Sequence, residues 1–372
     1  MTAAPAGETP LAARLKAAIR REGPMRVSDY MAACLDDPAH GYYRTRPAIG
    51  AAADFTTAPE ISQVFGELIG LWCAVVWQQM GAPAALNLVE LGPGRGTLMR
   101  DALRASRIVP GFQAALSVHL VDSNATLREA QRAMLAEAGP PIRFHDDVSA
   151  LGSAHALPAA PTIVIANEFL DTLPVAQLVY TRGAWHDRTV GLDGAGELAF
   201  SIGETVAEAR PVPAALAPQE GDILEIAAGH NTLAGDILRA RAGLGPLAAL
   251  FIDYGHAATG FGETLQGVAR QAHVSPLAAP GETDLSAQVD FQHFAEACRR
   301  AGLAVDGPVP QGEFLGRLGI VERTSRLMAA NPAKALAIEG QVQRLMAPTG
   351  MGSRFLAIGV RSAELAPLPG LA

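Results

Sequence analysis

Three glycines at alternate positions carry the clearest chemical signal in the chain. Residues 88–97 read LVELGPGRGT: an apolar segment, Leu86–Leu91, runs into Gly92, Gly94 and Gly96, and a helical pattern over Thr97–Ser106 follows. Glycine adopts positive φ and lets a ligand approach the backbone without meeting a Cβ. Such a turn between a strand and a helix of an α/β sheet predicts a nucleotide site, with a glycine-rich turn that binds nothing as the alternative.

The spacing of these glycines indicates which nucleotide is bound. Dinucleotide-binding proteins carry G-x-G-x-x-G, whereas the third glycine here comes one residue early and Glu90 stands two residues before the first. This pattern resembles motif I of class I S-adenosylmethionine methyltransferases. We therefore predict that Glu90, Pro93 and the three glycines contact S-adenosylmethionine, and that a dinucleotide-dependent oxidoreductase is the disfavoured alternative.

Polar residues follow the next predicted strands, Ser117–Asp122, Ile142–His145 and Thr162–Ala166. Parallel strands place their carboxyl ends on one edge of a sheet, where ligands bind. We predict a ribose contact from Asp122, which could instead be a helix N-cap. An adenine contact is predicted near Asp147, which could instead belong to a solvated turn. The predicted cofactor-binding residues on this edge are Asp122, Ser123, Asp147 and Asn167.

A second motif, NEFLDTLP over residues 167–174, begins where a buried strand ends. A carboxylate beside a core strand is costly without a partner, so Glu168 is predicted to be functional. Asp171 could act with it or cap a helix starting at Thr172. The segment DFTTAPEISQ, residues 54–63, is typical of a helix start. His256, after a predicted strand over Leu247–Asp253, is either a general base or an ordinary loop histidine.

Strands that alternate with helices predict an α/β fold with a mostly parallel sheet. Residues 10–85 are predicted to be mostly helical, with helices over 11–21 and 61–80 separated by a loop. We accordingly divide the chain into a helical N-terminal region, 1–85, and a domain over 86–372. Insertions in that domain are predicted at about 177–245, which opens with a hairpin turning at 182–183, and at about 262–345.

The amino-acid composition argues against several further classes of protein. The 372 residues include 29 basic and 37 acidic ones, for a net charge of −8, which argues against a general nucleic-acid binder. Three distant cysteines without C-x-x-C favour reduced thiols, and the histidine spacing predicts no metal site. The N-terminus shows no signal peptide, and the most apolar run, Phe65–Val76, is too short to span a bilayer. A soluble intracellular protein without membrane insertion is expected.

Several motifs together resemble one family, the MidA-like methyltransferases, which includes the mitochondrial complex I assembly-factor arginine methyltransferase. The resemblance covers roughly residues 10–360 and rests on seven segments: ADFTTAPEISQVFGELIG (53–70), LVELGPGRGTLM (88–99), ANEFLDTLPV (166–175), FIDYGH (251–256), ETLQGV (263–268), GETDLSAQVDF (281–291) and QGEFLGRLGI (311–320). It implies a class I methyltransferase fold with a helical N-terminal portion and an inserted substrate region. It also implies S-adenosylmethionine as cofactor and protein arginine methylation.

The resemblance implies residue roles and a partner as well. Gly92, Gly94 and Gly96 match the cofactor loop, Asp122 matches a ribose acid that is commonly Glu in the family, and Asn167-Glu168 match the motif after the fourth strand. The chain departs from the family at Ala53, often glycine, and at Gln288, often histidine. In the mitochondrial member the product is symmetric dimethylarginine on a complex I subunit. A protein with an exposed arginine is therefore the expected partner, and a homodimer is possible.

Joining a sulfonium to a guanidinium requires carboxylates, because two cations at about 4 Å repel by roughly 4 kcal/mol at an effective dielectric constant near 20. The candidates are Asp54, Glu60, Glu168 and Asp171, and we expect Glu168 to be the principal guanidinium ligand. The absence of a long leader suggests a bacterial, cytoplasmic member; a eukaryotic one would belong in the mitochondrial matrix. A small-molecule methyltransferase and a cofactor-binding assembly factor without turnover are the alternatives.

Overall fold

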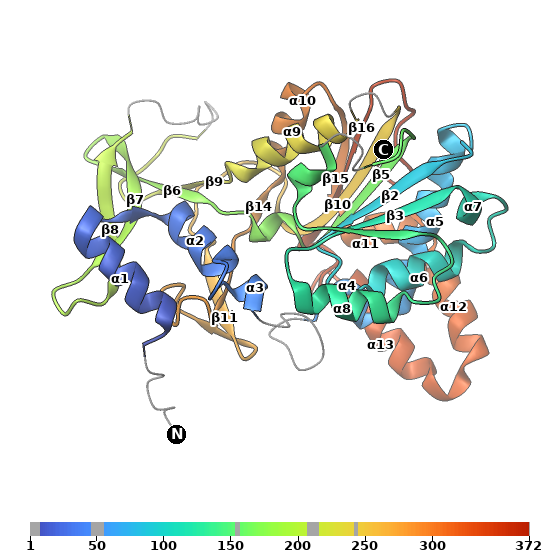
Figure 1. The fold of residues 1–372 in the computed structure, drawn as a ribbon, viewed down its shortest axis with the longest axis horizontal. Helices are drawn as coiled ribbons and strands as arrows, with labels where there is room; N and C mark the ends of the chain where they lie inside the picture. Colours follow the sequence, from blue (N-terminus) through green and yellow to red (C-terminus); the bar gives the residue numbers. More distant parts are fainter. Residues whose placement is uncertain (1–7, 46–55, 153–156, 207–215, 242–244, 372) are drawn as a thin grey trace. The chain divides into compact units, whose positions relative to one another are not determined.

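The structure of the chain is a computed structural model that describes residues 8–45, 56–152, 157–206, 216–241 and 245–371 (Figure 1). Its contacts divide the chain into two compact units that interleave along the sequence. The first comprises Met1–Ala48, Asp171–Gly229 and Ala258–Gln288; the second comprises Ile49–Leu170, His230–Ala257 and Val289–Ala372. The division at residue 85 stays a prediction, and the units are described one at a time.

The second unit contains the expected mostly parallel sheet. Its order within the described chain is β15-β16-β10-β5-β2-β3-β4, with β14 beside β10. The pairs β4–β3, β3–β2, β2–β5 and β5–β10 are parallel, and β16 and β15 close one edge antiparallel. These strands are β2 (Leu86–Leu91), β3 (Leu116–Val121), β4 (Ile142–His145), β5 (Thr162–Asn167), β10 (Leu247–His256), β14 (Val289–Asp290), β15 (Ala304–Pro310) and β16 (Phe355–Arg361).

This strand order places the glycine turn at the topological switch point of the sheet. The chain passes from β2 outward through β3 to β4, and then returns to the other side of β2 as β5. In open α/β sheets a crevice forms at that point, beyond the carboxyl ends of the strands, and ligands bind there. The strand ends that carry Gly92, Asp122 and Asn167 therefore meet on one edge, as the sequence predicts.

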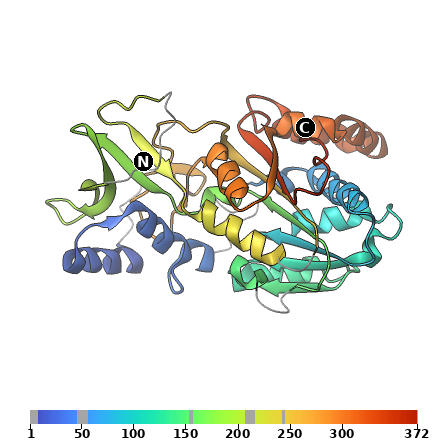
Figure 2. The same cartoon turned by 90° about the horizontal axis from the view of Figure 1, so that it is seen from above.

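Helices cover both faces of this sheet (Figures 1 and 2). On one face α5 packs on α6 so closely that a Cβ at Gly70 would lie 2.3 Å from the carbonyl oxygen of Ala102. On the other face lie α9 and α10. The helices are α4 (Ala58–Ile61), α5 (Gln63–Gln79), α6 (Thr97–Ser106), α7 (Phe112–Ala115), α8 (Ala125–Met134), α9 (Gly229–Arg241), α10 (Phe291–Arg300), α11 (Gln311–Arg317), α12 (Ile320–Ala330) and α13 (Ala335–Met346).

The first unit is built on antiparallel strands. Its larger sheet has the order β1-β7-β6-β9 with β8 beside β7, and its smaller one the order β12-β11-β13. The predicted hairpin is confirmed as β6 and β7, with Arg182 and Gly183 at positive φ in the turn. The elements are α1 (Pro10–Glu22), β1 (Met25–Arg26), α2 (Val27–Asp36), α3 (Tyr42–Thr45), β6 (Ala176–Thr181), β7 (Ala184–Leu192), β8 (Leu198–Thr205), β9 (Ile223–Ile226), β11 (Gln266–Ala269), β12 (Ala272–Val274) and β13 (Asp284–Ser286).

Two local predictions differ from the structure. The helix predicted over 61–80 is broken at Ser62, whose extended backbone ends α4 and whose hydroxyl accepts a hydrogen bond from the Val64 N–H to begin α5. The helix predicted to start at Thr172 is wrong, because Leu170–Thr172 is a short 3-10 turn that leads into β6. Residues 284–286 form β13, which pairs antiparallel with β11. None of the described helices is long and apolar enough to cross a membrane.

Candidate functional site

The glycine turn adopts the backbone conformation that its glycines permit. Gly92, Gly94 and Gly96 have φ of 61°, 52° and 85°, in the left-handed region that residues with a Cβ rarely adopt. A Cβ on Gly92 would lie 3.1 Å from the ring of Phe169. The turn is closed by the Gly96 N–H, which donates to the Pro93 carbonyl at 2.8 Å, and α6 then begins at Thr97. In general, the backbone N–H groups at the start of a helix are available to bind a ligand.

Asp122 is tied to this turn through a residue that the sequence did not single out. Its Oδ2 accepts a hydrogen bond from Gln131 Nε2 at 2.8 Å, and the same nitrogen donates to the Gly94 carbonyl at 2.7 Å. Its Oδ1 accepts from the Asn124 N–H at 2.8 Å. The N-cap of α8 is Asn124, so the alternative that Asp122 caps this helix is wrong. Gln131 gave no sequence signal because its partners lie 9 and 37 residues away.

Glu90, near the end of β2, is a buried carboxylate with one oxygen that accepts no hydrogen bond from the described residues. It is 3% exposed, and its Oε2 has no hydrogen-bond partner among the described residues. Burial raises the pKa of Glu90 to about 8, and the charge of Asp122 adds to the shift. A buried carboxylate of this kind is stabilised by a nearby cation. An S-adenosylmethionine molecule carries a positively charged ammonium and a positively charged sulfonium. The buried carboxylate of Glu90 therefore fits the expected cofactor.

Glu168 emerges at the end of β5 with a strained backbone. Its φ of 53° is unusual for a residue with a side chain. Oε1 accepts hydrogen bonds from the Ala58 N–H at 2.9 Å and from Asn167 Nδ2 at 2.8 Å. Burial raises the pKa of the Glu168 carboxyl, and these two bonds and the charge of Arg344 oppose that shift. Neither Glu168 Oε2 nor Asn167 Oδ1 accepts a hydrogen bond in the part of the chain that the structure describes.

A fully buried carboxylate, Asp253 on β10, fixes the turn after Glu168. Its Oδ2 accepts hydrogen bonds from the N–H groups of Phe169 and Leu170 at 2.9 and 2.8 Å, and its Oδ1 accepts from Tyr254 at 2.9 Å. The turn then holds the Phe169 ring against Gly92. The sequence marks Asp253 only as part of the FIDYGH segment, because the Phe169 and Leu170 N–H groups that it binds lie more than 80 residues away in sequence.

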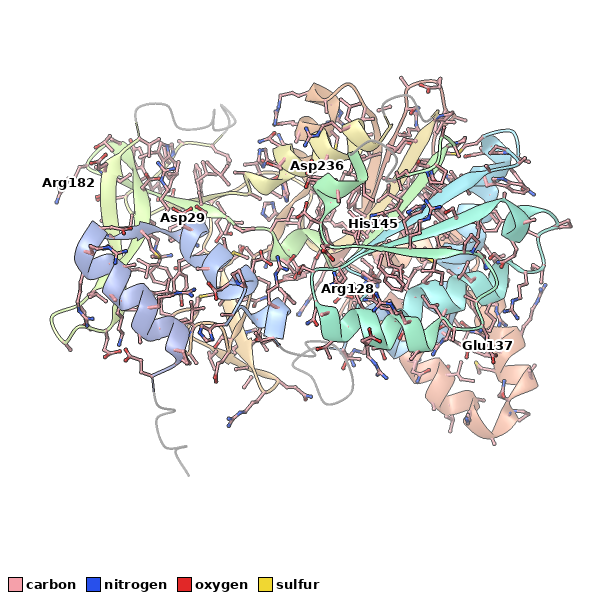
Figure 3. The ribbon with its side chains drawn as sticks, in the orientation of Figure 1. Asp29, Arg128, Glu137, His145, Arg182 and Asp236 are labelled. Atoms are coloured by element: carbon pink, nitrogen blue, oxygen red, sulfur yellow. The ribbon has the colours of Figure 1, made fainter. Side chains whose placement is uncertain are left out.

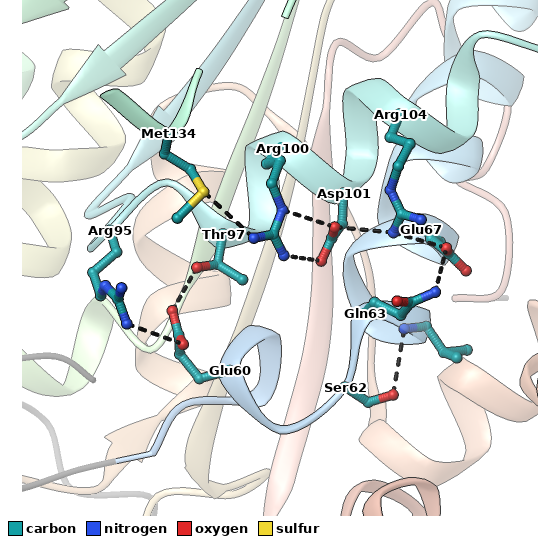
Figure 4. A network of polar contacts seen from close by, with 11 residues as sticks. Glu60, Ser62, Gln63, Glu67, Arg95, Thr97, Arg100, Asp101, Arg104 and Met134 are labelled. Atoms are coloured by element: carbon teal, nitrogen blue, oxygen red, sulfur yellow. Dashed lines mark hydrogen bonds and ion pairs between the residues drawn. The ribbon is translucent and has the colours of Figure 1, made fainter. Parts of the chain in front are cut away.

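Glu60, a predicted catalytic residue, lies on α4 beside the glycine turn (Figure 4). Its Oε1 accepts a hydrogen bond from the Thr97 hydroxyl at 2.5 Å, and its Oε2 lies 3.8 Å from the guanidinium of Arg95. Both oxygens therefore already face partners from the turn. A second cluster in Figure 4 joins Arg104 to the buried Glu67 at 2.9 Å.

The other predicted site residues are placed as follows. Asp54 lies outside the described residues. Asp171 belongs to the first unit, where burial, then the charges of Asp284 and Asp171, raise the pKa of Tyr43. His256 ends β10, and its backbone lies opposite that of Asp290 in the parallel pairing of β10 with β14. Asp147 accepts a hydrogen bond from the Ser149 N–H at 2.7 Å, in the turn that follows β4.

The segments after β3 and β4 are linked by a basic residue. Arg128, labelled in Figure 3, donates to the Asp122 carbonyl at 2.9 Å and pairs with the Asp146 carboxylate. The Asp122 N–H in turn donates to the His145 carbonyl at 3.0 Å. Ser123 follows Asp122 directly. These contacts hold together the two segments that carry the predicted ribose and adenine contacts.

Comparisons with known proteins identify the family. The model of a family described as "Putative S-adenosyl-L-methionine-dependent methyltransferase" matches residues 68–309. A curated relative, the mitochondrial protein arginine methyltransferase NDUFAF7 homolog of Drosophila melanogaster, is 36% identical over 98% of this chain and 89% of its own. Human NDUFAF7 is 33% identical over 93% of this chain and 82% of its own. The chain belongs to this methyltransferase family.

A solved structure agrees with the family. A Burkholderia thailandensis protein bound to S-adenosyl-homocysteine is 26% identical, covers 99% of this chain and 98% of its own, and superposes with a TM-score of 0.84. The methyltransferase described here therefore has the predicted α/β fold of S-adenosylmethionine-dependent enzymes, and S-adenosylmethionine is its cofactor. The expected family, reaction class and cofactor are confirmed.

Proposed function

We propose that this methyltransferase is a protein arginine N-methyltransferase that acts on a partner protein. Its curated relatives carry that activity in their names. The observation that carries the proposal is Glu168, a half-buried carboxylate that follows β5 on the edge of the glycine turn and keeps one oxygen without a hydrogen bond from the described residues. By extension from the mitochondrial relatives, we propose symmetric dimethylation and a respiratory complex I subunit as the partner.

The cofactor would be held by the residues already placed around the turn. We propose that Gly92, Gly94 and Gly96 leave room for it, that Asp122 binds its ribose hydroxyls and that Glu90 binds its positive charge. When bound, S-adenosylmethionine supplies the methyl group. The proposed cofactor-binding set is completed by Pro93, Ser123, Asp147 and Asn167.

A guanidinium acceptor explains the carboxylate at the end of β5. Arginine stays protonated in proteins, with a pKa above about 12, so a cation must be brought beside the cofactor's cation. Glu168 Oε2 can accept from the guanidinium while Oε1 stays held by Ala58 and Asn167. Such a charge-assisted bond orients the guanidinium plane and lowers its repulsion from the cofactor. The nitrogen that gains the methyl group then loses a proton, and Glu168 and His256 are the proposed groups for it.

Partner and location are proposed on the same relatives. A bacterial member would act in the cytoplasm and a eukaryotic one in the mitochondrial matrix. The second location is proposed because the curated relatives are named as mitochondrial proteins. A homodimer remains part of the proposal, and no nucleic acid or metal is included in it.

Transfer of label from S-adenosylmethionine into an extract tests the proposal. Purified protein is mixed with labelled S-adenosylmethionine and an extract of cells that lack the gene, and labelled bands are hydrolysed to identify the amino acid. Label in symmetric dimethylarginine on one discrete protein is expected. Label confined to a small molecule contradicts a protein substrate, and no label with S-adenosylhomocysteine binding intact supports an assembly factor without turnover.

A further inference from the structure

The single turn of α4 contacts both parts of the site within the second unit. At its start, the Ala58 N–H donates to Glu168 Oε1 at 2.9 Å. Two residues later, Glu60 accepts from the Thr97 hydroxyl and faces Arg95, which lies between the cofactor glycines Gly94 and Gly96. A four-residue element therefore joins the acceptor carboxylate to the cofactor turn.

The construction of α4 makes it a rigid connection. The Glu60 and Ile61 N–H groups both donate to the Thr57 carbonyl, at 2.9 and 3.1 Å. Ala58 and Ile61 are 0% and 6% exposed and belong to the hydrophobic core. Because both ends of the turn are packed, a displacement of Glu60 is carried to the Ala58 N–H rather than absorbed between them.

The surroundings of Glu60 argue against a direct role with substrate. Its Oε1 is held by the Thr97 hydroxyl and its Oε2 faces the Arg95 guanidinium. The next cation along α6, Arg100, forms its ion pair with Asp101 at 3.0 Å rather than with Glu60 (Figure 4). A substrate guanidinium at Glu60 would have to displace partners that belong to the cofactor turn.

We propose that Glu60 is a positioning residue that couples the cofactor turn to the Glu168 carboxylate through α4. Cofactor binding orders the turn; through Thr97 and Arg95 it holds α4, and α4 holds the hydrogen bond that aims Glu168. By linkage, an ordered Glu168 then favours cofactor binding by the same factor. The inference rests on the proposed function for the placement of S-adenosylmethionine at the glycine turn, but it needs no particular methyl acceptor.

The test measures binding of S-adenosylhomocysteine and hydrogen exchange of residues 57–62 in the full chain. Glu60→Ala and Thr97→Val remove the link from either side, whereas Thr97→Ser keeps the hydroxyl. Glu129→Ala, which removes an exposed pair with Arg132, is the matched control. Calorimetry is expected to show about 5- to 50-fold weaker binding for Glu60→Ala and Thr97→Val, and near wild-type binding for the other two.

Hydrogen exchange separates coupling from a merely structural effect. Saturating S-adenosylhomocysteine should slow exchange over 57–62 in the wild type and in Thr97→Ser. In Glu60→Ala that slowing should be lost, although exchange of residues 92–97 is still slowed. Equal slowing over 57–62 in wild type and Glu60→Ala overturns the inference. Failure of the extract to yield methylarginine, with this coupling intact, would count against the arginine acceptor alone.

Discussion

At the scale of single residues, Glu90 makes cofactor binding depend on pH. Its pKa of about 8, against an ordinary value of 4.5, means that the ligand-free protein holds a proton there at neutral pH. A cationic ligand favours the carboxylate and expels that proton. The affinity for S-adenosylhomocysteine should therefore rise by up to about tenfold per pH unit between pH 6 and 8 and level off above. Calorimetry in buffers of different ionisation enthalpy should show proton release at pH 7.

The raised pKa of Glu90 has the opposite effect on the stability of the ligand-free protein, which falls as pH rises. Because the folded pKa is raised, the contribution of Glu90 is complete below pH 4.5 and is lost as pH rises through about 8. Glu90→Gln should flatten both pH dependences, and Glu129→Gln, on the exposed side of α8, should change neither. Wild-type affinity that is constant from pH 6 to 8 would contradict the placement of the ligand's charge beside Glu90.

Substitution of Gly94 tests whether the glycine turn binds the cofactor. Gly94→Val should abolish detectable binding of S-adenosylhomocysteine, because a β-branched side chain strains a φ of 52° and fills the approach to the backbone. Gly183→Val provides the control for strain alone, since Gly183 has a φ of 77° and a Cβ at that position would meet no atom within 4 Å. Calorimetry and thermal unfolding compare the two variants. Unchanged affinity in Gly94→Val refutes the glycine-turn assignment.

At the scale of elements, Asp253 connects two turns from different strands. Asp253→Asn weakens two buried bonds to the Phe169 and Leu170 N–H groups, and bonds to charged groups are each worth about 1.5–3 kcal/mol. We expect a loss of about 2–4 kcal/mol in the free energy of unfolding and a fall in turnover larger than the fall in cofactor affinity. Denaturant unfolding and methyl transfer measured on one preparation check both.

A second buried carboxylate controls for stability alone. Asp306 accepts from the Leu368 N–H at 2.9 Å and pairs with Arg361 at 2.8 Å, away from the strand ends that carry the site. Asp306→Asn should destabilise the protein while the folded fraction keeps its turnover. If both variants lose turnover only in proportion to unfolding, Asp253 has no positioning role.

Local sequence predicted the elements that carry the cofactor turn. The apolar runs of β2, β3, β5 and β10 and the glycines between β2 and α6 give signals that neighbouring residues alone determine. The contacts that shape the site were out of reach of such signals. The Ala58 N–H bond to Glu168 spans 110 residues and the Asp253 bond to Phe169 spans 84, so neither leaves a periodic trace. The break at Ser62 was also missed, because the apolar pattern continues through it.

At the scale of the whole molecule, the chain enters each compact unit more than once. β1 pairs with β7 through Met25 and Val190, and the Thr9 hydroxyl donates to the Pro280 carbonyl, so segments far apart in sequence complete the first unit. The division of the chain at residue 85 and the bounds of the two insertions stay predictions. The strands of the second unit were easier to predict because strands and helices alternate along its sequence, the pattern that is typical of a parallel sheet.

The most direct test of arginine methylation compares binding and transfer in Glu168→Gln. Glutamine keeps an oxygen for the Ala58 and Asn167 donors but lacks the charge that pairs with a guanidinium. Calorimetry should give an S-adenosylhomocysteine affinity within about twofold of wild type, while label transfer to protein arginine falls at least about 100-fold. Full transfer by this variant, with cofactor binding intact, would contradict the assignment of Glu168 as the guanidinium ligand.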